Sequence, residues 1–317
     1  MIFEGSEKKV ELVVDPKVGS LRKLGRPFWE KVVERAEAQV LSMISSEGCD
    51  AYLLSESSLF VWDEYFTMIT CGQTTLVNAI SQFLETISKD DVLSLIFERK
   101  NEYFPRHQHT DFYEDCRRLN NMFSGTAMRF GHADDHHLYL YHMNKAYLPS
   151  ADDCTVEILM YDLQGQGKEI FSCFNQSSET IREKTKVDQI FPGFHVDDHA
   201  FRPCGYSLNA VRGKEYYTIH VTPEENGSYV SFESNINLEH GVQPTLMRVL
   251  EVFQPNAFDV IVFRPSGQKE KDYDFEVNGF QKKTTVIQKL SCGYDVSFTY
   301  HFRKPKEIQA ATLLEDF

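Results

Sequence analysis

The segment YLLSESSLFVWDEYFTMITC (52–71) constrains the fold of this chain more than any other stretch. Its apolar residues predict one strand across 52–61 and a second across 66–69. The acidic sequence Trp62-Asp63-Glu64 between them is typical of a hairpin turn. Within the first predicted strand, Ser55-Glu56-Ser57-Ser58 places four poor strand formers in a row. We interpret this run either as a strand that serves chemistry or as an exposed bend.

Composition and charge exclude several classes of protein. Of the 317 residues, 42% are hydrophobic and 13% aromatic, which is enough for a sizeable core and excludes global disorder. The net charge of -14 argues against a nucleic-acid partner. No apolar run approaches the ~18 residues that span a membrane, and the first residues lack the features of a signal peptide. The sequence therefore predicts a cytoplasmic protein with no membrane partner.

The seven cysteines are odd in number and scattered, and no two form a CxxC pair. We expect them to be free thiols in a reducing compartment.

Apolar periodicity predicts an α+β fold. Helices are expected across 28–41, 76–87, 111–123, 179–187 and 245–253. Strands are expected across 10–14, 92–97, 127–130, 137–141, 155–163, 206–211, 216–221, 228–233, 258–263 and 296–301, in addition to the two already named. The polar stretch 165–179 predicts an irregular connection, and the last dozen residues a tail. Strands that do not alternate strictly with helices favour antiparallel sheets with helices outside them.

A faint internal repeat is also present. Ser58-Leu59 leads through an aromatic segment to Cys71, and Ser207-Leu208 leads through a similar segment to His220 at the same spacing. This similarity predicts a duplicated fold.

Six residues are candidates for nucleophilic or acid–base chemistry: Ser57, Ser58, Cys71, Cys204, Ser207 and His220. A Ser/His or Cys/His pair is typical of a hydrolase, but no GxSxG motif surrounds any of the serines. A buried cysteine that fills the core and a hydrogen-bonded core histidine remain open as alternatives.

Two histidine clusters are candidate metal sites. One contains His132, His136, His137 and His142 with Asp134 and Asp135, and the other contains His195 and His199 with Asp197 and Asp198. Loop residues in contact with solvent explain both clusters more simply than ligation, so we predict no metal site.

Several motifs, in this order along the chain, resemble the eukaryotic-type S-adenosylmethionine decarboxylase proenzymes, which are pyruvoyl enzymes of polyamine synthesis. They are FEGSEK (3–8), YLLSESSLFV (52–61), TCGQTTL (70–76), PCGYSLNA (203–210), YTIHVTPE (217–224) and SYVSFESN (228–235). The resemblance implies a single domain across 1–317, folded as a four-layer αββα sandwich of two antiparallel sheets with helices outside and an internal duplication.

The resemblance further implies that the chain cuts itself between Glu56 and Ser57. The products would be a β chain, 1–56, and an α chain, 57–317, whose first residue becomes a pyruvoyl group. In this family the residue that matches His220 removes the Cα proton of Ser57, and the one that matches Ser207 forms a hydrogen bond in the same step.

Substrate decarboxylation is implied in the same way. The pyruvoyl group would form a Schiff base with S-adenosylmethionine, with no metal and no pyridoxal phosphate, and Cys71 would return a proton to the product. Decarboxylated S-adenosylmethionine would then serve as the aminopropyl donor in the synthesis of spermidine and spermine. Other matched positions are Glu4 and Glu7 near the active site, Phe3 and Phe201 around the adenine, Glu224 at the ribose, and Leu54 against the substrate.

An acidic regulatory site is also implied. Glu11, Asp153, Thr155, Glu157 and Glu233 match the residues that bind putrescine in animal members. Two positions depart from that pattern: Ile69 replaces a lysine, and Lys9 stands where animal members have an apolar residue and plant members an arginine. Because buried carboxylates need a cation, Lys9 is expected to supply one and to make putrescine dispensable or weakly stimulating. The alternative is that Lys9 points to solvent.

Two other functions remain open. A pyruvoyl-dependent ornithine or arginine decarboxylase of the same fold should have lost Phe3, Phe201 and Glu224, which are all present. A catalytically inactive regulatory paralogue should have lost the cleavage serine, the proton donor or the base, which are also present. Animal members form homodimers and plant members are single, and the sequence leaves this point open.

Overall fold

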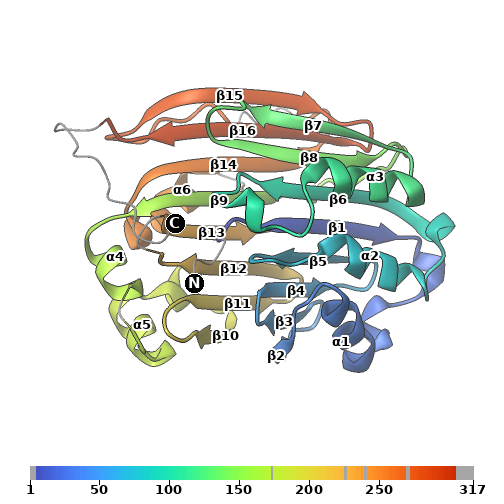
Figure 1. Cartoon of the computed structure of the whole chain (residues 1–317), viewed down its shortest axis with the longest axis horizontal. Coiled ribbons are helices and arrows are strands. Elements are labelled where there is room, and N and C mark those ends of the chain that lie inside the picture. Colours follow the sequence, from blue (N-terminus) through green and yellow to red (C-terminus); the bar gives the residue numbers. More distant parts are fainter. Residues whose placement is uncertain are drawn as a thin grey trace.

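The structure is a computed structural model that describes residues 5–172, 174–224, 227–236, 238, 241–268 and 272–304. Its strands form two eight-stranded antiparallel sheets (Figure 1). The first sheet has the order β2 (Val40–Ser45), β3 (Asp50–Leu54), β4 (Ser57–Val61), β5 (Tyr65–Thr70), β1 (Lys8–Val14), β6 (Val92–Lys100), β8 (His137–Met143) and β7 (Gly125–Gly131). The second has the order β10 (His195–Ala200), β11 (Tyr206–Arg212), β12 (Glu215–Thr222), β13 (Tyr229–Ser234), β9 (Thr155–Leu163), β14 (Pro255–Pro265), β16 (Tyr294–Phe302) and β15 (Gln281–Lys289).

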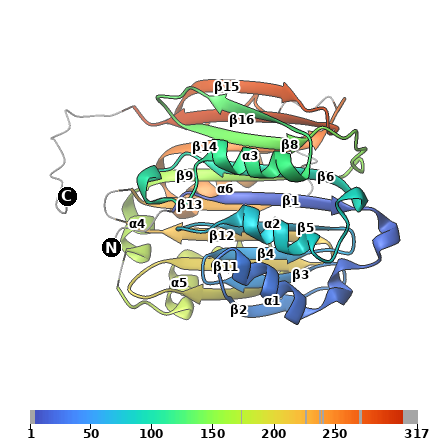
Figure 2. The ribbon, with the colours of Figure 1, turned by 45° about the vertical axis from the view of Figure 1, so that its right-hand side comes forward.

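Helices cover the outer face of each sheet. The helices α1 (Arg26–Arg35), α2 (Leu76–Leu84) and α3 (Phe112–Met122) lie in front of the first sheet in Figure 2, and α4 (Gly165–Phe171), α5 (Ser178–Thr185) and α6 (Gln243–Phe253) pack on the second. Short 3₁₀ helices span Pro16–Val18, Leu21–Leu24, Lys89–Asp91, Pro105–His107 and Val187–Gln189.

Apolar packing joins these elements into four layers. Between the first sheet and its helices, the ring of Trp29 lies 5.2 Å from that of Phe66 and 6.0 Å from that of Phe83. Between the two sheets, side chains of β6 and β8 such as Leu140 pack against side chains of β9 and β14 such as Ile261. The αββα sandwich expected from the sequence is therefore confirmed.

The two sheets have the same topology. If the strands of the second sheet are renumbered from β9 as 1, both sheets read 2-3-4-5-1-6-8-7. The expected duplication is thus confirmed, but the predicted alignment of the repeats is wrong by one strand. Ser207 lies on β11, the equivalent of β3, whereas Ser58 lies on β4. The match in spacing was therefore local similarity between strands that are not equivalent.

The predicted strand across 52–61 is also wrong. The polar run breaks it into β3 and β4, because Leu54 pairs directly with Ser57 and leaves Ser55-Glu56 as a two-residue turn. The turn predicted at Trp62-Asp63-Glu64 is present between β4 and β5.

Three other predictions need correction. The helix expected across 28–41 ends at Arg35, because Glu37 has a φ of 67° that a helix cannot continue through, and β2 follows. The stretch predicted as an irregular connection contains α4, whose Ile170 and Phe171 are buried. The strands β2, β10 and β15 were missed, because all three lie at sheet edges and are only partly buried.

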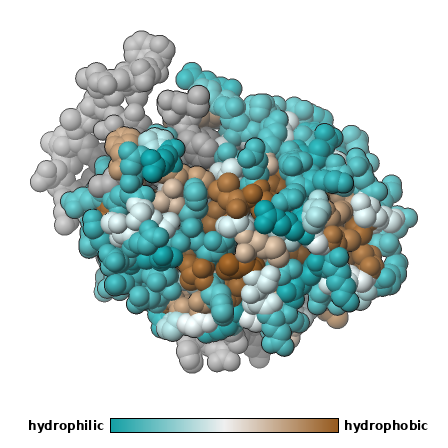
Figure 3. Space-filling view, turned by 90° about the horizontal axis from the view of Figure 1, so that it is seen from below, coloured by the Kyte–Doolittle hydropathy of each residue, from teal (hydrophilic) through white to brown (hydrophobic). Residues whose placement is uncertain are grey.

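The lower edges of the two sheets meet each other. Strands β2 and β10 lie side by side there, and the Ser42 hydroxyl donates to the Asp197 carboxylate. Figure 3, which views the molecule from below, shows apolar residues in the middle of this face; Leu41 of β2 is 40% exposed.

Within the described part of the chain, no helix has the length and apolarity to cross a bilayer. The six cysteines described there are free thiols, in agreement with the sequence.

Candidate active site

The turn between β3 and β4 holds the Glu56–Ser57 peptide bond under backbone strain. Ser57 has a φ of 131°, a region that costs a non-glycine residue about 1–3 kcal/mol. The turn is tied on both sides: the Ser55 amide donates to the Gln39 carbonyl at 2.8 Å, and the Cys71 amide donates to the Glu56 carbonyl at 2.9 Å. The second of these bonds also polarises the carbonyl carbon next to Ser57.

Cys71 lies against this bond. The Ser57 hydroxyl donates to the Cys71 sulfur at 3.4 Å, and the Cys71 thiol lies 3.4 Å from the Glu56 carbonyl oxygen, to which it donates. Burial raises the pKa of the Cys71 thiol well above its usual range. A thiol in this environment keeps its proton, which suits an acid rather than a thiolate nucleophile.

A second cluster forms around His220 on β12. Its Nδ1 lies 3.0 Å from the Ser207 hydroxyl, and its Nε2 lies 3.0 Å from the Thr218 hydroxyl. The single hydroxyl hydrogen of Thr218 is directed to the acceptors Leu208 O and Asn209 Oδ1, each at 3.0 Å. If Thr218 donates to either of these oxygens, it accepts the hydrogen of His220 Nε2, and Nδ1 keeps a lone pair toward Ser207. Burial lowers the pKa of His220 to about 3, so the ring is neutral.

Ser58 connects the two clusters across the interface between the sheets. Its hydroxyl donates to Asn209 Oδ1 at 2.6 Å and lies 3.4 Å from the Thr218 hydroxyl. In the part of the chain that the structure describes, no hydrogen bond joins Ser57 to Ser207 or His220. The structure thus brings Ser57 together with Cys71, and Ser207 with His220, and joins these pairs through Ser58.

Two carboxyl groups near the turn are shielded from solvent, Glu7 fully and Glu56 in part. Glu7 accepts a hydrogen bond from the Ser231 hydroxyl, and burial raises its pKa to about 8. Glu56 has a side-chain oxygen without a partner, and burial raises its pKa to about 7. Both groups therefore carry protons through part of the neutral range.

Fewer contacts in the structure locate the residues that the family resemblance assigns to the substrate. Leu54 is fully buried in the core below the helices. Phe201 stacks edge-on against His199 at 4.7 Å, and Glu224 follows the end of β12. Phe3 and Glu4 lie outside the described residues. The roles assigned to these five residues, and the role assigned to Glu7, therefore stay predictions.

Lys9 is buried in the acidic cluster rather than pointing to solvent. Its ammonium lies 2.7 Å from Glu157, 3.0 Å from Glu233 and 3.7 Å from Glu98. Burial alone would lower the pKa of Lys9, but these carboxylates outweigh it and raise that pKa well above its usual value.

Sequence reasoning missed two members of this cluster, Glu98 and Lys100. The Lys100 ammonium donates to Glu98 at 3.0 Å and to Glu157, and it helps lower the pKa of Glu157 to about 2 against the effect of burial. The only signal in the sequence was the charged end, ERK, of the apolar run 92–100.

The remaining part of the acidic cluster lies beside a very small cavity. Burial, with Asp153 as the next contribution, raises the pKa of Glu11 to about 8. Asp153 accepts a hydrogen bond from the Tyr294 hydroxyl at 2.7 Å. The cavity lined by Lys9, Glu11, Glu98 and Thr155 has a volume of about 10 Å³, roughly the space of one water molecule.

The rest of the described chain offers no alternative to the candidate active site around Ser57. No three His, Cys, Asp or Glu side chains there are grouped as metal ligands. His136 of the first histidine cluster stacks on Tyr300, and His199 of the second contacts Phe201. A cavity of about 450 Å³ between α4, α5 and α6 is lined by none of the candidate residues.

The fold and the site define a class of duplicated αββα enzyme whose strained serine lies beside a protonated cysteine. The family model described as adenosylmethionine decarboxylase matches residues 1–302. The chain belongs to this family, whose members are carboxy-lyases.

Proteins named S-adenosylmethionine decarboxylase proenzyme are similar along most of the chain. The one from Dictyostelium discoideum is 31% identical, over 96% of this chain and 87% of that protein. Those from Leishmania donovani and Xenopus laevis are 38% and 34% identical, each over 82% of this chain and over 73% and 83% of those proteins. A crystal structure titled as the Trypanosoma brucei AdoMetDC-delta26 monomer aligns with a TM-score of 0.60 and 26% identity, over 78% of this chain and 99% of that one.

Proposed function

We propose that this chain is a proenzyme that cuts itself before Ser57 and then decarboxylates S-adenosylmethionine for spermidine and spermine synthesis. The observation that carries the proposal is the strained Glu56–Ser57 peptide, tied to Cys71 by three contacts. Strain of this kind persists where the surrounding structure holds it, and such places are frequently reactive.

In the proposed cleavage, the Ser57 hydroxyl attacks the Glu56 carbonyl carbon. The peptide C–N bond breaks, an ester bond forms, and the Ser57 amine is freed. His220 then takes the Cα proton of Ser57, and the Glu56 carboxylate leaves from Cβ. Water hydrolyses the resulting dehydroalanine, through its imine, to a pyruvoyl group and ammonia. The β chain 1–56 and the α chain 57–317 stay together, because β3 and β4 remain in one sheet.

The pyruvoyl group would supply a carbonyl that binds the substrate amine and takes up the electrons released with CO2. The role of Cys71 is to hold a proton within reach and return it to the product. Its raised pKa keeps the thiol protonated at neutral pH, so the proton is available for return to the product. As the family resemblance implies, Phe3 and Phe201 would stack on the adenine and Glu224 would bind the ribose.

We further propose that Lys9 takes the place of an external diamine. Its ammonium already contacts three carboxylates, and the adjoining cavity has room for little more than one water. Turnover measurements with and without the diamine test whether putrescine is an effector. Light scattering tests whether a second copy of the chain is a partner.

A mass measurement on the purified chain tests the proposed cleavage. We expect two fragments, 1–56 and 57–317, the second without a free N-terminal amine, and an intact chain for Ser57→Ala. Release of labelled CO2 from S-adenosylmethionine, compared with ornithine and arginine, then tests the substrate. An intact wild-type chain after long incubation would refute the proposal and favour an inactive paralogue, while CO2 from ornithine or arginine alone would favour the other decarboxylases.

A further inference from the structure

Lys8 is a buried lysine on β1 with no carboxylate among its hydrogen-bond partners in the described part of the chain. It is 2% exposed, and its ammonium donates to the Gly72 carbonyl at 3.0 Å and to Gln108 Oε1 at 2.7 Å. The strand register places Lys8 opposite Thr70, which is itself opposite Ser57. Lys8 therefore lies in line with Ser57, on the face of the sheet that the helices cover.

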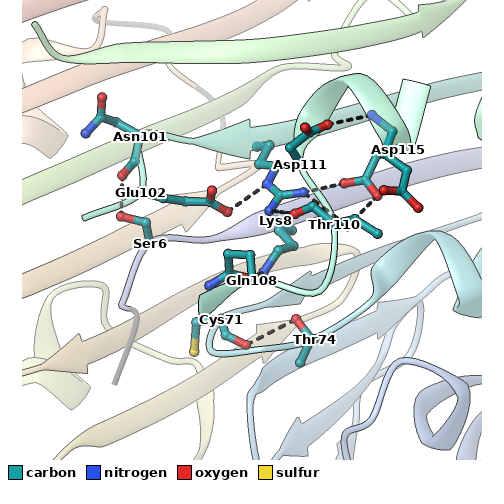
Figure 4. Close-up of polar contacts among 12 residues, drawn as sticks. Ser6, Lys8, Cys71, Thr74, Asn101, Glu102, Gln108, Thr110, Asp111 and Asp115 are labelled. Carbon is teal, nitrogen blue, oxygen red and sulfur yellow. Dashed lines mark hydrogen bonds and ion pairs between the residues drawn. The ribbon is translucent and has the colours of Figure 1, made fainter. Parts of the chain in front are cut away.

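The partner of Lys8 is held by an extensive polar network. Gln108 belongs to the loop between β6 and α3, which Figure 4 shows close to Lys8 and Cys71. Arg99, 1% exposed, ties both ends of this loop: it contacts Glu102 at 2.7 Å, Asp115 at 2.6 Å and the Thr110 carbonyl. This network fixes the loop without touching the site, so it can hold Gln108 and, through it, the Lys8 ammonium.

The Gly72 carbonyl is the point at which this network reaches Cys71. The residues after β5 form a turn in which the Thr74 hydroxyl donates to the Cys71 carbonyl at 3.1 Å (Figure 4). The Lys8 ammonium donates to the next carbonyl along the chain, that of Gly72. The Cys71 amide and thiol both face the Glu56 carbonyl, so any shift of this turn moves the thiol relative to Ser57.

We infer that Lys8 is a positioning residue for Cys71: its ammonium, held by Gln108, fixes the Gly72 carbonyl and thereby sets the place of the thiol beside Ser57. The positive charge of Lys8 also stabilises the thiolate that Cys71 becomes when it gives up its proton. This inference rests on the proposed function for its kinetic consequence, but not for its structural one.

The structural consequence is tested on the uncleaved Ser57→Ala chain, where the processing reaction plays no part. Amide hydrogen exchange of the segment 70–75 is followed with Lys8→Met added. We expect exchange of the Cys71 amide to become at least about tenfold faster, because its bond to the Glu56 carbonyl is no longer held. Lys145→Met is the matched control, since Lys145 also donates to a backbone carbonyl, that of Val92 at 2.7 Å, and should leave the segment unchanged.

The kinetic consequence is tested on the processed enzyme. Lys8→Met should lower kcat about 10–100-fold with KM within about twofold, because a misplaced proton donor affects turnover and not substrate binding. Lys8→Arg should restore most of the loss, since a guanidinium can donate to the same carbonyl. Gln108→Leu should give an intermediate kcat.

Unchanged exchange of the segment 70–75 in Lys8→Met would overturn the inference, as would an unchanged kcat in a processed Lys8→Met enzyme. An equal change in Lys145→Met would show a general loss of stability and would overturn it too. A wild-type chain that never releases CO2 would refute the proposed function instead, and the exchange measurement would still decide the role of Lys8.

Discussion

Replacement of Lys9 by methionine should destabilise the fold strongly and in a pH-dependent way. Methionine keeps most of the side-chain volume and removes only the charge. The ammonium it deletes contacts Glu157, Glu233 and Glu98 in a fully buried cluster. Removing one partner of a buried ion pair typically costs about 3–5 kcal/mol, because the remaining charge stays desolvated.

The structure places the expected loss of stability at the lower end of this range. Lys100 still contacts Glu98 and Glu157 after the change, so only Glu233 loses its cation, and the Tyr216 hydroxyl still donates to it. We expect the free energy of unfolding to fall by about 3 kcal/mol at pH 8. At pH 6 the cluster can take up a proton, which recovers up to about 1.4 kcal/mol for each pH unit over which that proton is bound.

The assay is urea unfolding at pH 6 and pH 8, with Lys17→Met as control. Lys17 contacts Asp91 at 2.7 Å, but this pair is exposed to solvent, so its loss should change the stability little. If Lys9→Met lost no more stability than the control, the buried ion cluster would contribute little and our reasoning would be refuted.

The same position tests regulation by diamines. Lys9→Ala opens space beside the existing cavity, so putrescine should restore part of its turnover and stability while leaving the parent enzyme almost unchanged. Strong stimulation of both the parent and Lys9→Ala would contradict the proposal that Lys9 serves as the internal cation.

Three further predictions follow from the site. Cys71→Ser should still be cleaved but should turn over about 10²–10⁴-fold more slowly, as measured by CO2 release, because a proton donor is lost. His220→Asn should slow formation of the 1–56 fragment by a similar factor, followed by mass spectrometry. Glu11→Gln should raise stability at pH 8 and change it little at pH 4.5: the folded pKa of Glu11 is about 8, so its contribution is present below the unfolded value of 4.5 and is lost as the pH rises toward 8. Urea unfolding across this range checks the last prediction, and an equal effect at both ends would contradict it.

The sequence predicted the strands at the centre of each sheet and missed three strands at the sheet edges, β2, β10 and β15. Strands at the centre of the second sheet, such as β9 and β14, are buried along most of their length and are rich in apolar residues. The edge strands β10 and β15 are half exposed, and their polar residues resemble loop sequence. The polar run Ser55–Ser58 left both a strand and a bend open, and only the pairing of Leu54 with Ser57 shows that a turn divides it.

The site was predictable in its residue types and not in its contacts. A resemblance indicated Ser57, Cys71, Ser207 and His220, but nothing in the sequence shows that Ser58 joins the two pairs. Glu98 and Lys100 were overlooked because charged residues at the end of an apolar run normally mark its exit to solvent. Only the closing of a second sheet over them makes these charges buried, and that is a property of the tertiary fold.

The absence of a hydrogen bond between Ser57 and His220 in the described structure agrees with the proposed chemistry. Neighbouring residues of a strand point to opposite faces, so Ser57 faces the helices with Cys71, while Ser58 faces the second sheet with Thr218. His220, which shares a face of the second sheet with Thr218, therefore lies on the Ser58 side of β4 and not on the side of the Ser57 hydroxyl. The proposed elimination requires a base for the Cα proton, which belongs to the backbone, whereas the hydroxyl must remain free to attack the Glu56 carbonyl. Placing the base and the hydroxyl on opposite faces of β4 keeps the two steps from competing for the same atom.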